Sequence, residues 1–172
     1  MDYSHVQFHI HDSQEIKNLA HTAGTALHRD GRSLDYDQLL NLFRVAAFWA
    51  RERSIDDLKM AVANSRPVVT LWDGDRLIGF SRATSDGIFR ATIWDVVVHP
   101  DYQGAGLGRK LVQTVLMHPH VNQAERVYLM TTHQQEFYKR IGFQENSTTT
   151  MVLFNQVEES LPMLVQHIAE DA

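Results

Sequence analysis

The chain has 172 residues, 44% of them hydrophobic, and a formal net charge of −5 at pH 7. This length suits one globular domain, and the absence of cysteine excludes disulfides, thiolate metal sites and catalysis through a thiol. The acidic balance, without a lysine- or arginine-rich tract, indicates no nucleic-acid partner. No apolar run reaches the roughly 18 residues of a membrane-spanning helix, and the N-terminus lacks a secretory signal. We therefore expect a cytoplasmic protein without a membrane partner.

The N-terminal third predicts one strand followed by helices. Alternating apolar and polar residues predict a short strand over Val6–Ile10. Three pairs then have the spacing of a helix N-cap and its partner, namely Asp12 with Glu15, Asp35 with Gln38, and Ser54 with Asp57. The inward-facing residues of the last two helices are Tyr36, Leu39, Leu40, Phe43 and Ala47, and then Leu58, Ala61 and Val62.

Beyond Pro67 the pattern changes from helical to extended. Strands are predicted over Val68–Trp72 and Leu77–Thr84, joined by Asp73-Gly74-Asp75, which is typical of a tight hairpin. A long strand from Phe89 to His99 ends in consecutive valines. Such a β-branched run predicts a central strand that is buried on both faces.

Helices and strands alternate in the last part of the chain. A helix from Arg109 to about Met117 and a strand over Arg126–Met130 come first. The next predicted helix is capped by Thr132 with Gln135 and ended by Gly142. A strand over Thr148–Phe154 and an amphipathic helix through Leu161, Leu164, Val165 and Ile168 follow. A strand-helix-strand unit inside a mostly antiparallel sheet predicts a mixed α/β (α+β) fold.

A glycine-rich turn from Gln103 to Gly108 joins the valine strand to the next helix. Glycine permits positive φ, so several backbone N–H groups can converge at the helix N-terminus and bind a pyrophosphate without a lysine. A tight turn that only permits packing explains the glycines equally well. Arg109 stands where GxGxxG needs its last glycine, and the P-loop sequence GK[ST] is missing. A dinucleotide-binding module is therefore the weakest alternative.

The stretch DVVVHPDYQGAGLG, from Asp95 to Gly108, resembles the cofactor motif of the GNAT (GCN5-related N-acetyltransferase) superfamily. The family pattern Gln/Arg-x-x-Gly-x-Gly/Ala is matched by Gln103, Gly106 and Gly108. The later FYKRIGF, from Phe137 to Phe143, is similar to the family's second helical signature. More narrowly, ATIWDVVVHP resembles the plastid and cyanobacterial branch, which includes serotonin N-acetyltransferase-like enzymes and chloroplast protein-lysine or N-terminal acetyltransferases.

The resemblance implies a GNAT-like fold, in which a central, mixed and mostly antiparallel sheet with a splayed parallel pair is flanked by helices. It implies one domain, with residues 1–67 as the acceptor side, 68–154 as the cofactor-binding core and 155–172 as a C-terminal helix. Acetyl-CoA is the implied co-substrate, and no metal is implied. The implied cofactor contacts are the backbone of Val96, Val97 and Val98 for pantetheine, Gln103, Gly104, Ala105, Gly106, Leu107, Gly108 and Arg109 for the pyrophosphate turn, and Thr131, which stands where the family often has Asn.

Direct acetyl transfer needs a neutral amine, a polarised thioester carbonyl and a proton for the departing thiolate. By family position Tyr138 is the candidate acid, although a helix tyrosine used only for packing is the alternative. Asp95 is the leading candidate base, because an acidic residue in an apolar strand is unusual; alternatively it is salt-bridged to an arginine. Tyr102 is the second candidate base and otherwise covers the core. A water chain is the remaining alternative.

The expected activity is transfer of acetyl to a primary amine, with an arylalkylamine such as serotonin as one candidate acceptor. Protein lysines or N-termini, and a non-catalytic CoA-binding module, are the alternatives. An aromatic group formed by Phe43, Phe48, Trp49 and Trp72 lines an acceptor pocket or belongs to the core. The histidine pairs His9/His11 and His118/His120 lack a third ligand, so no metal site is expected. We expect a monomer or a homodimer.

Overall fold

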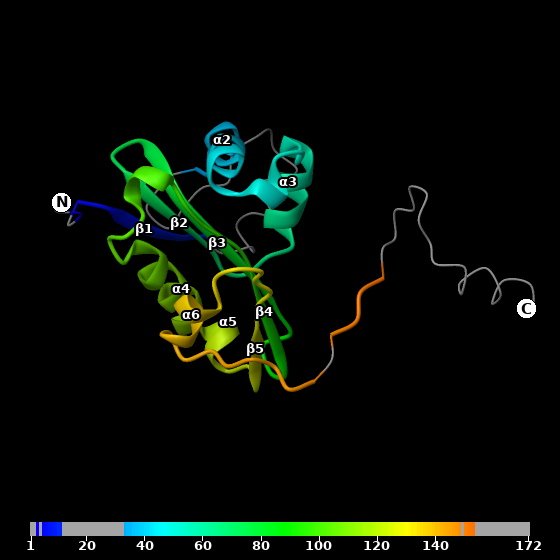
Figure 1. Cartoon of the computed structure of the whole chain (residues 1–172). Helices are drawn as coiled ribbons and strands as arrows, with labels where there is room; N and C mark the ends of the chain where they lie inside the picture. Colours follow the sequence, from blue (N-terminus) through cyan, green and yellow to red (C-terminus); the bar gives the residue numbers. More distant parts are fainter. Residues whose placement is uncertain (1–2, 4, 12–32, 149, 154–172) are drawn as a thin grey trace, which may run out of the picture.

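The computed structural model describes residues 3, 5–11, 33–148 and 150–153, whose strands form one sheet between helices (Figure 1). The strands are β1 (Gln7–His11), β2 (Val68–Asp73), β3 (Arg76–Ser85), β4 (Arg90–Val98) and β5 (Arg126–Tyr128). The helices are α2 (Tyr36–Ala46), η1 (Phe48–Ala50), α3 (Ile55–Ala63), η2 (Pro100–Tyr102), α4 (Leu107–Met117), α5 (Pro119–Asn122) and α6 (Gln135–Lys139). None of the helices in these ranges is long and apolar enough to cross a membrane.

The five strands lie in the order of the sequence, β1-β2-β3-β4-β5. Strands β1 to β4 pair antiparallel with their neighbours, whereas β4 and β5 are parallel. A parallel pair needs a crossover connection, which α4 and α5 supply. The predicted mixed fold, mostly antiparallel with one parallel pair, is confirmed.

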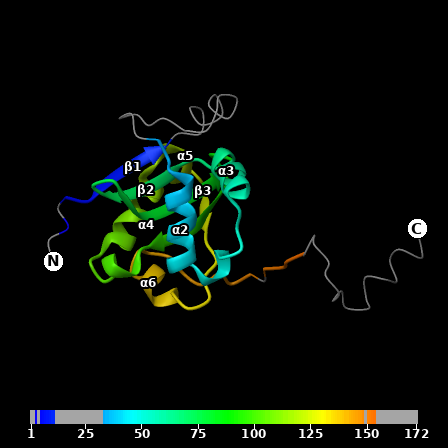
Figure 2. The same cartoon turned by 90° about the horizontal axis from the view of Figure 1, so that it is seen from above.

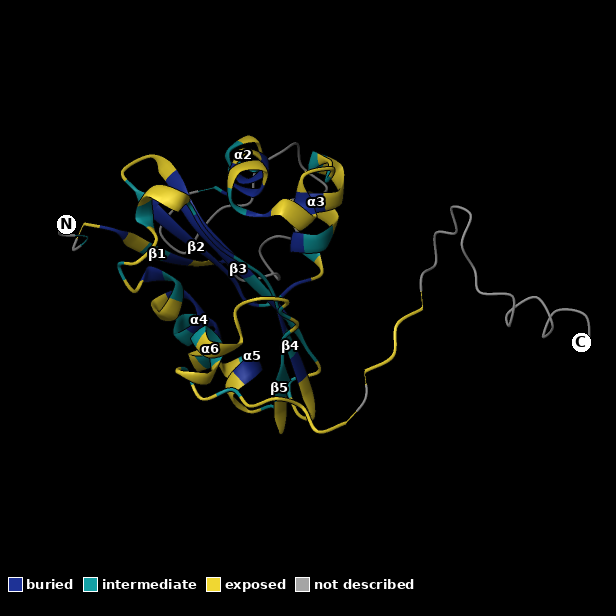
Figure 3. Cartoon of the chain, viewed as in Figure 1, coloured by how far each residue is buried: buried dark blue, intermediate teal, exposed yellow. Residues whose placement is uncertain are grey.

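Helices cover both faces of the sheet. Helices α2 and α3 lie over one face, and α4, α5 and α6 lie over the other (Figures 1 and 2). The strands between them are mostly buried (Figure 3). Val97 belongs to the apolar cluster under α2 and α3, whereas Val98 belongs to the cluster under α4. The prediction that this strand is buried on both faces is confirmed for these two valines, while Val96 is half-buried.

Helix α2 is tied to the β2–β3 hairpin by Gln38. The predicted cap is present, because the Gln38 backbone N–H donates to Asp35 Oδ1 at 3.0 Å. The Gln38 side chain does not close a capping box with the backbone. Its Oε1 accepts the Leu77 N–H at 2.8 Å, and its Nε2 donates to the Asp75 carbonyl at 3.1 Å. The capping box of Ser54 and Asp57 at α3 has both reciprocal bonds, as predicted.

Three predictions for the last part of the chain are wrong in detail. Strand β5 ends at Tyr128 instead of Met130, because its pairing with β4 ends there. Helix α6 starts after Gln134, since Thr131 Oγ1 accepts the Gln134 N–H at 3.1 Å and Thr132 caps nothing. Residues 148 and 150–153 are exposed and form no strand, because no described strand pairs with them. The helices predicted after Asp12 and from Leu161 lie outside the described residues.

Replacing Gln38 by Ala is expected to lower the free energy of unfolding by about 1–3 kcal/mol, because the buried Leu77 N–H loses its acceptor. Urea unfolding followed by circular dichroism measures the change. The matched control is Asn41→Ala on the exposed side of the same helix, which should stay within about 0.5 kcal/mol of the parent. Equal losses in both variants would contradict the tie between helix and hairpin.

Candidate functional site

The glycine-rich turn lies where β4 leaves the sheet and α4 begins. Gly104 and Gly106 have φ values of +79° and +77°, a conformation that L side chains rarely adopt. A Cβ at either position would meet no atom within 4 Å, so the turn is open to the outside. At Gly108 a Cβ would lie 3.5 Å from the Phe137 ring, which places α6 directly beside the start of α4.

The backbone of this turn presents free donors. Gly106 is the N-cap of α4 and supplies no side-chain acceptor, and the first hydrogen bond of the helix is Lys110 N–H to Gly106 O at 3.1 Å. The N–H groups of residues 104–109 donate to no described residue. Unpaired amides at a helix N-terminus attract anions. The exposed Arg109 and Lys110 add positive charge at the same end of the helix.

Strand β4 continues beyond its parallel partner. The β4–β5 pairing ends at Thr92 and Tyr128, whereas β4 runs on to Val98. The His99 N–H donates to Ile78 O at 2.7 Å on the β3 side, so by antiparallel alternation Val98 turns its own N–H and C=O away from β3. The Val98 carbonyl accepts from Gln103 Nε2 at 2.9 Å. Gln103 therefore fixes the turn against the strand end.

A β-bulge interrupts β4 at Asp95. Phe80 pairs with Val97 and Arg82 with Trp94, so β4 has one residue more than β3 in this interval. Asp95 has a φ of +56° and is the only described non-glycine residue with positive φ. Aspartate tolerates this left-handed conformation better than most residues. The bulge lies between the last β5 contact of β4 and the run Val96–Val98.

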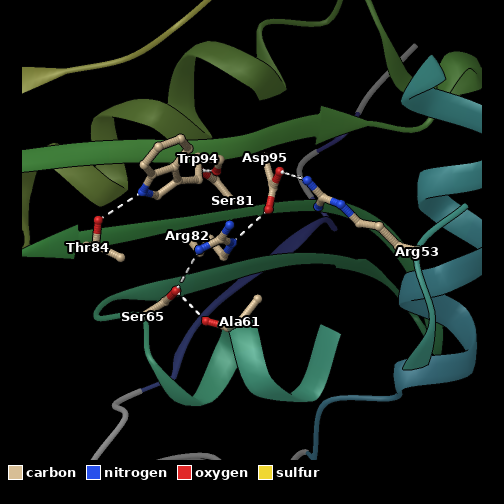
Figure 4. A network of polar contacts seen from close by, with 8 residues as sticks. All are labelled: Arg53, Ala61, Ser65, Ser81, Arg82, Thr84, Trp94 and Asp95. Carbon is tan, nitrogen blue, oxygen red and sulfur yellow. Dashed lines mark hydrogen bonds and ion pairs between the residues drawn. The ribbon is translucent and has the colours of Figure 1, made fainter. Parts of the chain in front are cut away.

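The Asp95 carboxylate is buried between two arginines (Figure 4). Its Oδ2 is 2.7 Å from Arg82 Nε and its Oδ1 is 3.0 Å from Arg53 Nη2, and only 5% of the side chain is exposed. Of the two predicted roles, the structure shows the salt bridge. Sequence reasoning did not single out Arg53 or Arg82. The available signal was the carboxylate itself, since a charge in an apolar strand requires a counter-charge.

Tyr138 lies on α6 against other aromatic rings. Its ring makes edge contacts with Phe137 and Phe143, at centroid distances of 4.9 and 5.9 Å. Burial raises the pKa of its phenol above the ordinary 10.0. Its hydroxyl has no hydrogen-bond partner among the described residues. Tyr138 and the half-buried Thr131 both line a cavity of about 740 Å³ beside β5.

Tyr102 is engaged with the β2–β3 hairpin. Its hydroxyl donates to Asp73 Oδ2 at 2.5 Å, and its ring contacts Tyr3, His99 and the Arg76 guanidinium. The hydrogen bond to Asp73 is the main cause that raises the pKa of Tyr102. The structure therefore places the predicted turn residues together, but the three catalytic candidates each contact a different set of neighbours.

The four aromatic residues predicted as one group fall into two places. Phe43 and Trp72 are buried core residues, whereas Phe48 and Trp49 are 65% and 52% exposed. Their rings meet edge to face at a centroid distance of 5.1 Å. An acceptor pocket made of all four is therefore ruled out, and Phe48–Trp49 remains as an exposed aromatic pair. The described histidines and acidic residues form no group of three that could hold a metal.

Comparison with known proteins agrees with this geometry. A family model described as an acetyltransferase (GNAT) domain matches residues 57–145. An uncharacterized N-acetyltransferase, ycf52-like, from Prochlorococcus marinus is 44% identical over 102 residues, covering 57% of this chain and 56% of the relative. The chloroplastic GCN5-related N-acetyltransferase 1 of Arabidopsis thaliana is 34% identical over 125 residues, covering 70% and 61%. The chain spans about half the length of the ycf52 relatives it matches.

A solved structure has the same fold. A GNAT-family acetyltransferase from Streptococcus pneumoniae TIGR4 superimposes with a TM-score of 0.63 at 23% identity, covering 88% of this chain and 99% of that one.

Replacing Gly106 by Ala is expected to weaken CoA binding about tenfold. Gly106 has a positive φ, and an L residue in this left-handed conformation costs roughly 1–2 kcal/mol. If the backbone relaxes to avoid this cost, the N–H groups of the turn change direction. Calorimetric titration with CoA measures the affinity. Gly74→Ala is the matched control, since Gly74 has a φ of +57° and equal open space but lies in the β2–β3 hairpin. If both variants bind CoA as the parent does, the glycine-rich turn is not the binding site of the CoA pyrophosphate.

Proposed function

We propose that this chain, which belongs to the GNAT acetyltransferase family, transfers the acetyl group of acetyl-CoA directly to a primary amine. The observation that carries this proposal is the row of unpaired amides at residues 104–109, at the end of a strand whose outer edge is open. The amides suit a pyrophosphate. The open edge of β4 suits an extended chain such as pantetheine, which adds to a strand by backbone hydrogen bonds.

Different groups of the protein would act at each step of the transfer. The amine nitrogen forms a bond to the thioester carbon while the C–S bond breaks, and the thiolate takes up a proton. A backbone N–H on the open edge of β4 near Val98 would bind the carbonyl oxygen, which gains charge in the transition state. Val97 is the other candidate donor, but it takes part in the pairing with Phe80. Tyr138 would supply the proton to sulfur, and burial keeps its phenol protonated.

The proton lost by the amine needs an acceptor. Both Asp95 oxygens already face arginines, and the Tyr102 hydroxyl already donates to Asp73. A base must lie within hydrogen-bond reach of the proton it takes, and these contacts commit both side chains elsewhere. We therefore favour water as the base over Asp95 and Tyr102.

For the acceptor we propose an arylalkylamine such as serotonin. The exposed Phe48–Trp49 pair supports this choice, because aromatic rings stack with or meet each other edge to face. Protein lysines and N-termini are the second candidate, from the resemblance to chloroplast acetyltransferases of that kind. The chloroplastic relative supports a plastid location over the cytoplasm.

Thiol release from acetyl-CoA, measured side by side with serotonin, tryptamine, polyamines and lysine peptides, tests the activity and the acceptor class together. Faster release with the two indole amines supports the arylalkylamine, whereas release only with peptides favours a protein acceptor. Tight CoA binding without release for any amine would leave a non-catalytic CoA-binding module.

Tyr138→Phe is expected to lower kcat about 100-fold with little change in CoA affinity, because only the proton donor is removed. Since burial raises the pKa of Tyr138 above 10.0, loss of its proton should not reduce the parent's kcat until the pH exceeds 10. Steady-state kinetics across pH, with calorimetric CoA titration, measure both effects. Phe143→Leu on the neighbouring ring is the packing control, and an equal loss there would reduce Tyr138 to a packing residue.

A further inference from the structure

We propose that Asp95 is a positioning residue that holds the acceptor side of the protein against the bulge of β4. It does so through the Asp95 clamp, defined here as Asp95, Arg53 and Arg82. The inference rests on the proposed acetyl transfer for its effect on catalysis, but the clamp itself is a contact between elements. We therefore expect Asp95 to affect the binding of the acceptor amine and not the binding of acetyl-CoA.

The position of the clamp along β4 is the first argument. Asp95 follows the last residue that pairs with β5, Thr92, and precedes the strand end at Val98, from which the glycine-rich turn starts. A thioester held along the open edge would therefore lie beside the bulge. Any segment fixed to Asp95 is fixed close to the reacting atoms.

The two arginines bring the two ends of α3 to this point. Arg53 immediately precedes the N-cap of α3. At the other end, Arg82 Nη1 donates to Ser65 Oγ at 3.1 Å, and Ser65 Oγ donates to Ala61 O at 2.7 Å in the last turn of α3 (Figure 4). The N-terminal end of α3 is thus tied to β4 through the Asp95 carboxylate, and its C-terminal end is tied to Arg82 of β3, which binds the same carboxylate.

The charges in the clamp make it dependent on that carboxylate. Two guanidinium groups face one carboxylate, with 5% of Asp95, 15% of Arg82 and 30% of Arg53 exposed. Without Asp95, two like charges remain close together in a poorly solvated place. Arg82 keeps Ser65 and the Trp94 ring, which lies 5.7 Å from its guanidinium carbon. Arg53 is the more exposed partner and is the one expected to leave.

Release of Arg53 would free the exposed aromatic pair. Phe48 and Trp49 lie in the same connection between α2 and α3 as Arg53. The Arg53 side chain has one further described contact, its guanidinium carbon 5.0 Å from the Phe43 ring centroid. Together with the buried Ala47 and Ala50, the clamp therefore sets where Phe48–Trp49 lies relative to β4, and with it the proposed site of the acceptor.

The variant that tests this is Asp95→Asn, because asparagine also tolerates positive φ and removes only the charge. We expect KM for the best acceptor to rise about tenfold and KM for acetyl-CoA to change less than about twofold. Asp95→Gly, which keeps the bulge conformation at no steric cost, should behave in the same way. Asp56→Asn is the matched control on the exposed surface of α3 and should match the parent.

A second readout does not need turnover. Fluorine NMR of protein labelled with 5-fluorotryptophan gives one signal for each of the three tryptophans, Trp49, Trp72 and Trp94. In Asp95→Asn the signals of Trp49 and Trp94 should move, because the Trp94 ring lies 5.7 Å from the Arg82 guanidinium carbon and Trp49 shares the connection between α2 and α3 with Arg53. The Trp72 signal should stay, because Trp72 is buried in the core and its indole donates to Thr70.

Several outcomes overturn the inference. An unchanged acceptor KM in either Asp95 variant, or an unmoved Trp49 signal, shows that the clamp does not hold the acceptor side. A parallel rise of both KM values with a shift of the Trp72 signal shows a general structural defect. If the parent protein acetylates no amine, the proposed function fails, and the Trp49 and Trp72 signals alone decide whether Asp95 holds the connection between α2 and α3.

Discussion

Strand β4 is paired with β3 along most of its length but with β5 only from Arg90 to Thr92. Among the described residues, this unequal pairing leaves one edge of β4 without a partner strand from Ile93 to Val98. Unpaired backbone groups are costly when they are buried. A strand edge of this kind therefore suits an extended ligand, such as the proposed pantetheine arm, that can form the missing hydrogen bonds. Both the turn at residues 104–109 and the bulge at Asp95 are placed by where this strand ends and bends.

The bulge introduces a buried charge at the same place. Burying a carboxylate is unfavourable unless ionic and hydrogen-bonding partners compensate for it. Arg82 supplies one partner from the adjacent strand, and Arg53 supplies the other from the connection between α2 and α3. The ion pairs therefore add a polar contact between the sheet and the α2–α3 layer to the apolar packing that joins them.

Local signals in the sequence predicted local structure well. The caps at Asp35 and Ser54 and the positive φ of Gly106 depend on residues within a few positions, and each is present. Contacts between residues that are far apart in the sequence have no local signal of this kind. The arginines that pair with Asp95, and the Asp73 that accepts from Tyr102, are ordinary surface-type residues in the sequence. The bulge of β4, the β2–β3 hairpin and the connection between α2 and α3 bring them to their partners only in the folded chain.

This difference explains why the geometry of the glycine-rich turn was predictable and the proposed acceptor side was not. The proposed donor side consists of backbone N–H groups, and their direction follows from glycine positions and the end of a strand, which are visible in the sequence. The proposed acceptor side consists of side chains on the connection between α2 and α3. Phe48 and Trp49 are of the same residue types as the core residues Phe43 and Trp72. Their exposure depends on how the connection between α2 and α3 lies on the sheet. Ala47 and Ala50 bury this connection in the core, and the Arg53–Asp95 ion pair joins it to β4, so its position depends on contacts with residues far away in the sequence.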